Sequence, residues 1–316
     1  MIDGGRDVKV TFLGTGGSVP TKKRNLPSLA VRTNGGLVMF DCGEGTQKQF
    51  LIAKLGFNRE MQILISHMHA DHILGIPGLL HSMSFMGRSR DLEIYGPPGI
   101  NEFVKCTAET LKFRPLFSVR IVEIHAGIVA KTRGFTIKAA WAEHGVPCLA
   151  YSLTENDKPG RFHPAKAKQL KIPKGPLWKV LQMGKTIKVG GKKIDPAKVV
   201  GPSRKGLKIT YAVDTRPCDR IIKLAFGSDL LVHDGMFSSE VSERAREYGH
   251  STAAEAATVA KRSRSKSLAL THLSSIYEDT KQLLAEAKAI FPRTIVAEEL
   301  RSLELSDHSR KRSPTD

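Results

Sequence analysis

Cysteine is scarce in this sequence, with only four cysteines among 316 residues. They stand far apart and form no Cys-x-x-Cys pair, which argues against a zinc ribbon and a disulfide framework. No apolar run approaches the ~18–20 residues that a membrane-spanning helix needs. The first residues, Met1 to Arg6, lack the apolar core of a secretory signal peptide. We therefore expect a protein of the reducing cytoplasm with no membrane segment.

Acidic residues are also few, since 31 Asp and Glu face 49 Lys and Arg, for a formal charge of +18. The excess is concentrated in residues 156–208, which hold 15 basic and two acidic residues and so carry +13. Such a segment favours a polyanionic partner, although a solvated lysine-rich loop would have the same composition. Its six prolines exclude a long helix or a sheet interior.

Strand-like and helix-like segments alternate through the rest of the chain. We predict strands at 8–13, 28–33, 37–40, 62–65, 92–95, 119–124, 135–141, 149–153, 209–213, 230–232, 268–271 and 294–297. We predict helices near 46–55, 76–86, 239–248, 253–263 and 280–289. This mixture indicates an α/β sandwich of two sheets with helices outside. Residues 1–155 and 209–305 would form one domain, 156–208 an inserted basic arm, and 306–316 a polar, disordered tail.

Metal-binding side chains follow the strand predicted at 62–65. The segment Ser66 to His72 places three imidazoles and one carboxylate within six residues, namely His67, His69, Asp71 and His72. His67 and His69 can point the same way from extended chain, and Asp71 and His72 could hold a second ion. Catalytic zinc usually takes about three protein ligands, so more are needed. Candidates follow three further strands: His144, Asp214 and His272.

The motifs along the chain resemble those of ribonuclease Z, a family of the metallo-β-lactamase superfamily that trims the 3′ trailer from tRNA precursors. His-x-His-x-Asp-His is the superfamily signature. The narrower pattern comprises Phe12-Leu13-Gly14-Thr15-Gly16, Phe40-Asp41-Cys42-Gly43-Glu44-Gly45-Thr46-Gln47, Gly75-Ile76-Pro77-Gly78-Leu79-Leu80, Tyr95-Gly96-Pro97, Glu143-His144-Gly145-Val146, Asp214-Thr215-Arg216, His250-Ser251-Thr252 and Thr271-His272. The resemblance implies a metallo-β-lactamase-type αββα sandwich with a protruding arm.

The resemblance also implies a site with two zinc ions per subunit, although other divalent ions are possible. Metal 1 would be bound by His67, His69, His144 and Asp214, and metal 2 by Asp71, His72, His272 and the same, bridging Asp214. Two ions ~3.5–4 Å apart clamp the attacking and leaving oxygens of an in-line displacement. Asp71 would orient the attacking water and accept its proton. Asp41 is a plausible acceptor for a ligand imidazole.

His250 is the candidate general acid for the ribose oxygen that leaves. Ser251 or Thr252 would cap the next helix, and both would contact substrate at its N-terminus. In the family a Glu usually supports the histidine that corresponds to His250. This chain has Asp234 in place of that Glu. The carboxylate is one methylene shorter, so the relay requires a closer backbone or an intervening water. The family often has an Arg where this chain has Ile276, so a possible phosphate contact is absent.

Two further segments have an expected role, a glycine-rich one at residues 14–18 and one in the basic arm at residues 170–178. Residues 14–18 lack the Gly-Lys-Ser/Thr of a phosphate-binding loop, so we expect them to form a turn near the site. Within the basic arm, residues 170–178 resemble the element that grips the tRNA elbow in the family. The contact residues would be Lys171, Lys174, Gly175 and Pro176.

The expected reaction leaves a 3′-hydroxyl on the tRNA and a 5′-phosphate on the trailer. The resemblance implies precursor tRNA as the partner, and a homodimer in which one subunit's arm serves the other's site. Two alternatives remain: another dinuclear zinc phosphodiesterase or thioester hydrolase of this fold, or an RNA-binding protein without catalysis.

Overall fold

The computed structural model describes residues 8–306 and divides them into two compact units. The larger unit comprises residues 8–154 and 207–306, and the smaller comprises residues 155–206. The sequence predicted the inserted segment at 156–208. Of the predicted tail, residues 307–316 lie outside the described residues. No described helix has the length and apolar character to cross a membrane.

Two seven-stranded sheets form the framework of the larger unit. The first has the order β18 (Ser302–Leu305), β1 (Val8–Gly14), β3 (Ser28–Thr33), β4 (Gly36–Phe40), β5 (Met61–Leu64), β6 (Leu92–Gly96), β7 (Val119–Glu123). The second has the order β17 (Thr294–Val296), β15 (Leu268–Thr271), β14 (Leu230–Asp234), β13 (Lys208–Ala212), β10 (Leu149–Glu155), β9 (Phe135–Trp141), β8 (Gly127–Lys131). In the first sheet β4 pairs in parallel with β5, and β5 with β6. In the second sheet β13 pairs in parallel with β14, and β14 with β15. The carboxyl ends of neighbouring parallel strands therefore share an edge.

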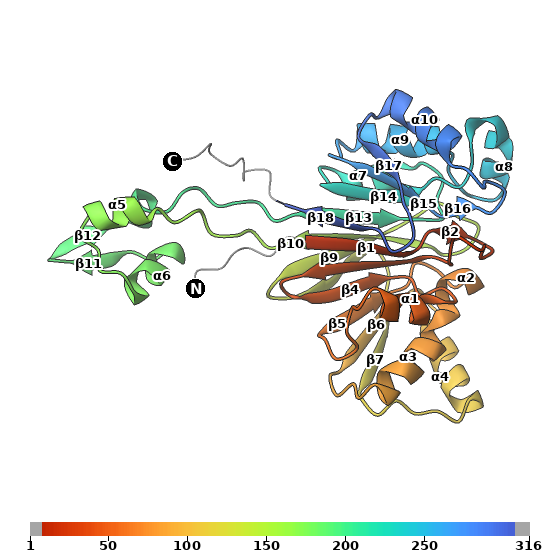
Figure 1. Cartoon of the computed structure of the whole chain (residues 1–316), viewed down its shortest axis with the longest axis horizontal. Helices are drawn as coiled ribbons and strands as arrows, with labels where there is room; N and C mark the ends of the chain where they lie inside the picture. The colour runs from red at the N-terminus through yellow and green to blue at the C-terminus, as the bar shows by residue number, and fades with distance from the viewer. Residues whose placement is uncertain (1–7, 307–316) are drawn as a thin grey trace. The chain divides into compact units, whose positions relative to one another are not determined.

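Helices cover the outer face of each sheet (Figure 1). On one side lie α1 (Thr46–Ile52), α3 (Gly75–Phe85) and α4 (Ile100–Thr110), and on the other α7 (Asp219–Ala225), α9 (Ala253–Arg262) and α10 (Lys281–Ile290). Alternate residues of a strand face opposite sides of its sheet. Leu230 and Val232 pack in the core between the two sheets, and Leu231 packs against the outer helices. This αββα sandwich confirms the predicted fold class.

Several elements of the larger unit were not predicted from the sequence, and most of them are short or lie at sheet edges. These are the helices α4, α7 and α2 (Ala70–Ile73), the edge strands β8 and β18, and the short paired strands β2 (Gly16–Gly17) and β16 (Leu273–Ser274). Half-exposed edge strands such as β18 lack a continuous apolar run. The helix predicted at 239–248 is a 3₁₀ turn, Ser239–Val241, followed by α8 (Ser242–Glu247).

The smaller unit has its own apolar core around Trp178 and Leu181. Its two short helices, α5 (Pro164–Gln169) and α6 (Pro176–Gln182), each begin at a proline. Proline is favoured at a first helical position because its missing N–H has no helical partner there. The hairpin of β11 (Ile187–Val189) and β12 (Lys192–Ile194) turns through Gly190 and Gly191, both at positive φ. The prolines that exclude a long helix thus begin two short ones.

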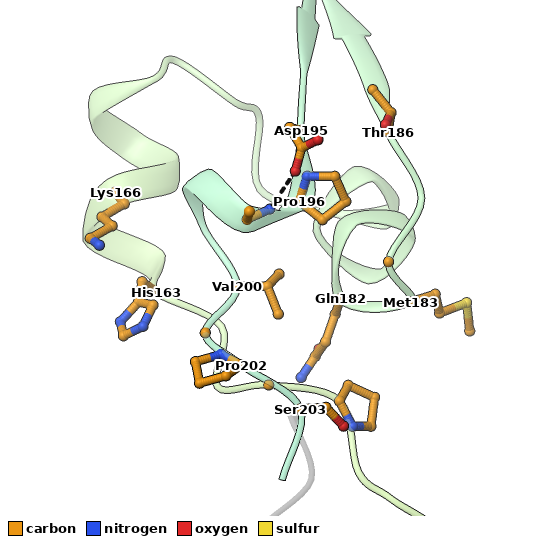
Figure 2. A pocket seen from close by; sticks show the side chains of 15 residues that line it. His163, Lys166, Gln182, Met183, Thr186, Asp195, Pro196, Val200, Pro202 and Ser203 are labelled. Carbon is orange, nitrogen blue, oxygen red and sulfur yellow. Dashed lines mark hydrogen bonds between the residues drawn. The ribbon is translucent and has the colours of Figure 1, made fainter.

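A surface pocket of about 880 Å³ lies within this smaller unit. Figure 2 shows it between α5, the end of α6 and the turn after β12. Among its lining residues are His163, Lys166, Gln182 and Asp195. Asp195 also caps the following 3₁₀ turn through the N–H of Ala197 at 2.8 Å. The unit is thus a folded module with a surface hollow.

Candidate metal centre

The predicted site residues follow strand ends at one edge of the sandwich. His67 to His72 follow β5, His144 follows β9, Asp214 follows β13 and His272 follows β15. Both sheets therefore contribute to one cluster. The structure brings together the seven residues predicted as metal ligands.

The first group contains His67, His69, His144 and Asp214, whose donor atoms all lie within 4.8 Å of one another. The Nε2 atom of His67 is 2.9 Å from Nδ1 of His69 and 3.6 Å from Oδ2 of Asp214. The Nε2 atom of His144 is 3.4 Å from Nδ1 of His69. Three imidazoles and one carboxylate thus converge on one point.

The second group contains Asp71, His72 and His272. The Nε2 atoms of His72 and His272 are 3.4 and 3.5 Å from Oδ2 of Asp71. The same nitrogens are 3.4 and 3.1 Å from Oδ1 of Asp214. Because Oδ2 of Asp214 faces the first group and Oδ1 the second, this carboxylate lies between them.

The donor set fits a metal ion. Nε2 of His72, Nε2 of His272 and Oδ1 of Asp214 are buried, and none of them makes a hydrogen bond of normal geometry within residues 8–306. This arrangement is costly unless another group satisfies these atoms. Zinc–nitrogen bonds of ~2.0–2.1 Å place tetrahedral ligand atoms roughly 3.3 Å apart. The separations of 2.9 to 3.6 Å given above suit that geometry.

Protonation states in the cluster mostly suit metal binding, which requires ionised carboxylates and neutral imidazoles. Burial lowers the pKa of His67 and of His144. Burial opposes ionisation of Asp71 and Asp214, but His272 and His72 hold both pKa values well below the usual range. His72 is the exception: despite its burial, the carboxylates of Asp214 and Asp41 raise its pKa. Metal binding there must displace a proton.

Asp41 supports the second group by contacting the His72 ring on the nitrogen that faces away from the cluster. Its carboxylate pairs with Nδ1 of His72 at 2.8 Å and accepts hydrogen bonds from the Ser66 N–H at 2.7 Å and the Tyr211 hydroxyl at 2.9 Å. Such partners fix the orientation of a ligand imidazole. The acceptor role that the sequence suggested for Asp41 is the one the structure shows.

The glycine-rich turn near the chain's start also reaches the cluster. The N–H of Ser18 donates to Oδ2 of Asp71 at 2.9 Å. A Cβ added at Gly17 would lie 2.6 Å from the His272 ring, so only glycine fits. Residues 14–18 therefore lie at the site, as predicted, but they form the end of β1 and the short strand β2 where a turn was expected. No helix directly follows them in the described part of the chain.

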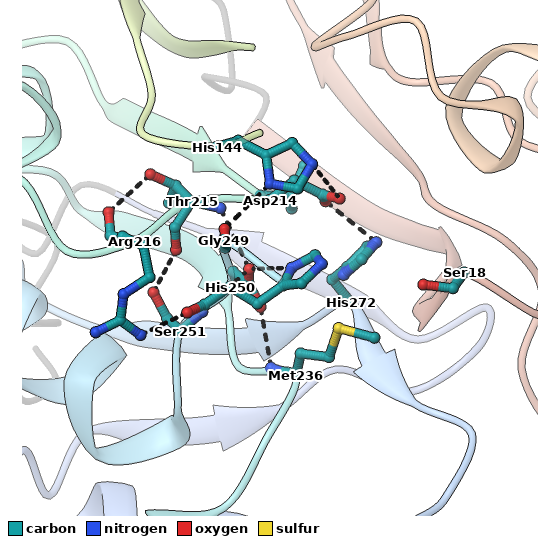
Figure 3. Close-up of polar contacts among 12 residues, drawn as sticks. Ser18, His144, Asp214, Thr215, Arg216, Met236, Gly249, His250, Ser251 and His272 are labelled. Atoms are coloured by element: carbon teal, nitrogen blue, oxygen red, sulfur yellow. Dashed lines mark hydrogen bonds and ion pairs between the residues drawn. The ribbon is translucent and has the colours of Figure 1, made fainter. Parts of the chain in front are cut away.

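His250 and Asp234 contact each other directly, at 2.8 Å between Nδ1 and Oδ2. The shorter carboxylate thus reaches the imidazole without a bridging water. Burial lowers the pKa of His250, but the charge and hydrogen bond of Asp234 outweigh burial and raise it to about 9. The His250 ring stacks on His272 with centroids 5.2 Å apart (Figure 3).

The two predicted substrate contacts beside His250 have buried side chains. The Ser251 hydroxyl donates to the Thr215 carbonyl. Thr252 caps α9 by accepting from the Glu255 N–H at 3.2 Å, and the Glu255 carboxylate accepts from the Thr252 N–H at 2.9 Å. Thr252, not Ser251, is thus the cap, and substrate contact by either remains a prediction.

One contact near the site, made by Arg24, was not predicted from the sequence, and four predicted arm residues lie outside the cluster. Arg24 donates to the Tyr277 carbonyl at 2.8 Å. An arginine from a loop of the first sheet thus supports the segment in which Ile276 stands where the family often has an arginine. Lys171, Lys174, Gly175 and Pro176 are exposed residues of the smaller unit. Their contact with tRNA remains a prediction.

Comparison with known proteins places the chain in a class and then in a family. The sandwich is that of a metallo-β-lactamase fold protein: one from Bacillus subtilis matches with a TM-score of 0.67 and 20% identity over 95% of this chain and all of that chain. A family model described as anti-Pycsar protein Apyc1 matches residues 8–144.

Full-length relatives give the family. Ribonuclease Z of Methanosarcina acetivorans is 44% identical over 94% of this chain and 98% of its own length. Ribonuclease Z of Nitrosopumilus maritimus is 40% identical over 94% of this chain and all of its own. The structure of the short form of human tRNase Z matches with a TM-score of 0.69 and 27% identity, covering 94% of this chain and 99% of that chain. The chain belongs to the ribonuclease Z family.

Asp214→Ala should lower the amount of bound metal sharply, because this carboxylate faces both ligand groups. Metal content after gel filtration, measured by mass spectrometry, tests this. Asp219→Ala is the matched control, since Asp219 is exposed and forms a surface ion pair with Arg262. An Asp214→Ala protein that retained the wild-type metal content would contradict the shared-ligand assignment.

Proposed function

We propose that this protein is a zinc-dependent endoribonuclease that cuts the 3′ trailer from tRNA precursors. It would leave a 3′-hydroxyl on the tRNA and a 5′-phosphate on the trailer. The observation that carries this proposal is the seven-residue donor cluster beside the His250–Asp234 pair, in a chain related to ribonuclease Z over almost its whole length.

Two zinc ions per subunit suit the two ligand groups. His67, His69 and His144 would hold one ion, Asp71, His72 and His272 the other, and Asp214 would bridge them. When bound, such a pair of ions activates water and stabilises the charge on the attacking and leaving oxygens.

Two side chains would handle protons. Asp71, whose Oδ2 already lies among His72, His272 and the Ser18 N–H, would orient the attacking water and accept its proton. His250 would donate a proton from Nε2 to the leaving ribose oxygen, because Asp234 occupies Nδ1. Burial lowers the pKa of His250, but Asp234 outweighs burial and raises it, which favours the protonated form that a general acid needs.

The smaller unit would hold the body of the precursor as an inserted arm. Residues 156–208 carry +13, and Lys171 and Lys174 are exposed in the segment between α5 and α6. Lysines neutralise phosphates without reading bases, which suits structured RNA, a ligand recognised mainly by shape and backbone.

We further propose that the protein acts in the cytoplasm as a homodimer. Exposed apolar side chains on the larger unit, such as Phe85, Met86 and Leu116, are the kind of surface that a second copy covers. Light scattering should give twice the 34.7 kDa chain mass, and a monomer mass would contradict this.

Incubation with a 3′-extended tRNA tests the proposed reaction. The purified protein should cut once near the 3′ end of the mature sequence, and a chelator should abolish the cut. End mapping should find the phosphate on the trailer. Hydrolysis of a small chromogenic phosphodiester without cleavage of the precursor would instead indicate another phosphodiesterase of this fold.

Asp234→Asn should move the alkaline limb of the single-turnover rate to lower pH. The carboxylate raises the pKa of His250, so its loss lowers that pKa, and the protonated imidazole disappears earlier as pH rises. Bound cations would lower the pKa in both proteins and leave the direction unchanged.

His250→Ala is the reference variant for that experiment. It should cut the chemical step by roughly 10²–10⁴-fold, the usual range for a general acid, and lose the limb. Metal content and RNA affinity should stay close to wild type. An unchanged alkaline limb in Asp234→Asn would show that His250 is not the proton donor.

Replacing Lys171 and Lys174 with Gln should weaken binding of precursor tRNA. The slope of log K against log salt should flatten by about 0.7–0.9 for each phosphate that a lysine no longer neutralises. Lys105→Gln with Lys112→Gln is the matched control, because both lysines are exposed on the larger unit. If the two double variants had equal affinities and equal salt slopes, the proposed tRNA contact would be wrong. The smaller unit would then be only a solvated lysine-rich insertion.

A further inference from the structure

The guanidinium group of Arg216 holds the main chain of His250. Its Nη1 donates to the His250 carbonyl at 2.6 Å and to Oε2 of Glu255 at 2.8 Å, while Nη2 donates to Oε1 of Glu255 at 2.5 Å. Figure 3 shows the Arg216 side chain directed at the segment that carries His250 and Ser251. This two-pronged pairing is charge-assisted and geometrically rigid.

Glu255 extends the same hold to the other end of the segment. Its carboxylate accepts the Thr252 N–H at 2.9 Å, in the capping box that begins α9. The Arg216–Glu255 pair therefore fixes the carbonyl of His250 and the amide of Thr252. The side chains are 16% and 29% exposed, so the pair is partly shielded from solvent.

The main chain of Arg216 connects this segment to a proposed metal ligand. Its N–H donates to the Glu143 carbonyl at 2.8 Å, next to His144. His144 in turn contacts the Gly249 carbonyl through Nδ1 at 3.1 Å. Arg216 thus lies where the loop carrying His144 and the loop carrying His250 meet.

We propose that Arg216 is a positioning residue for the proton donor, with Glu255 as its partner. Asp234 fixes the imidazole of His250 at Nδ1, and Arg216 fixes the backbone from which that imidazole extends. Asp234 also accepts the Ser251 N–H at 3.3 Å, and the His250 N–H donates to the Ala245 carbonyl at 2.8 Å. The Arg216 guanidinium adds the hydrogen bond at the His250 carbonyl, which neither of those contacts restrains. This inference rests on the proposed role of His250.

Arg216→Met should lower the single-turnover cleavage rate on the order of 10- to 10²-fold, the scale expected from a small displacement of a reacting group. KM for precursor tRNA and bound metal should change little. Arg216→Lys should restore part of the rate, because an ammonium keeps the charge and one hydrogen bond but not the fork.

Two further variants separate positioning from folding. Glu255→Gln preserves the capping box, in which Gln can replace Glu, and weakens only the charged pair, so a several-fold loss of rate is expected. Arg262→Met is the matched control. Arg262 lies at the end of the same helix and forms a solvent-exposed ion pair with Asp219 at 2.9 Å. Replacing Arg262 should leave the cleavage rate unchanged. A wild-type rate in Glu255→Gln would overturn the proposal.

A double-mutant cycle with His250→Ala decides whether Arg216 acts through His250. If it does, Arg216→Met should slow the wild-type enzyme but add little to His250→Ala. Equal slowing in both backgrounds would overturn the positioning role and leave the proton donor intact. A wild-type rate in His250→Ala alone would remove the proton donor from the proposed function, and the role of Arg216 with it.

Discussion

Buried carboxylates are the constraint on which the site depends. Asp41, Asp214 and Asp234 are at most 3% exposed, and an ionised carboxylate in that position is costly unless charges and hydrogen bonds compensate it. Each lies at the carboxyl end of a strand and is surrounded by imidazoles and N–H groups. The histidines thus stabilise the acids, and the acids orient the histidines. Metal ions would complete this balance rather than create it.

The backbone carries strain at the same edge. Ser18, Asp41, Asp214 and His272 are four of the nine described non-glycine residues with positive φ. Such a conformation costs of order 1–3 kcal/mol at each residue and persists only where the surroundings enforce it. Here the enforcing surroundings are two sheets whose parallel strands end together, with apolar cores on both faces. The sandwich supplies rigidity that a loop alone lacks.

Much of the fold and the cluster was predictable, because the central strands are continuous apolar runs and the ligand residues stand directly after them. The hairpin through Gly190 and Gly191 was missed because its strands are only three residues long. The helices α4 and α7 were missed although both carry buried apolar residues at helical spacing. Contacts between distant loops were beyond sequence reasoning. Arg216 and Glu255 are 39 residues apart, and only the folded loops show that the guanidinium reaches His250. The direct contact of the shorter Asp234 likewise depends on backbone placement.

We propose that one edge of the sandwich holds two metal ions that act together. Stepwise addition of zinc to metal-stripped protein tests it most directly, with bound metal and single-turnover cleavage of a 3′-extended tRNA measured on the same samples. Our account predicts that cleavage rises with the second equivalent of bound metal, because Asp214 joins both ligand groups. Full cleavage with one equivalent, or in the metal-free protein, would contradict it.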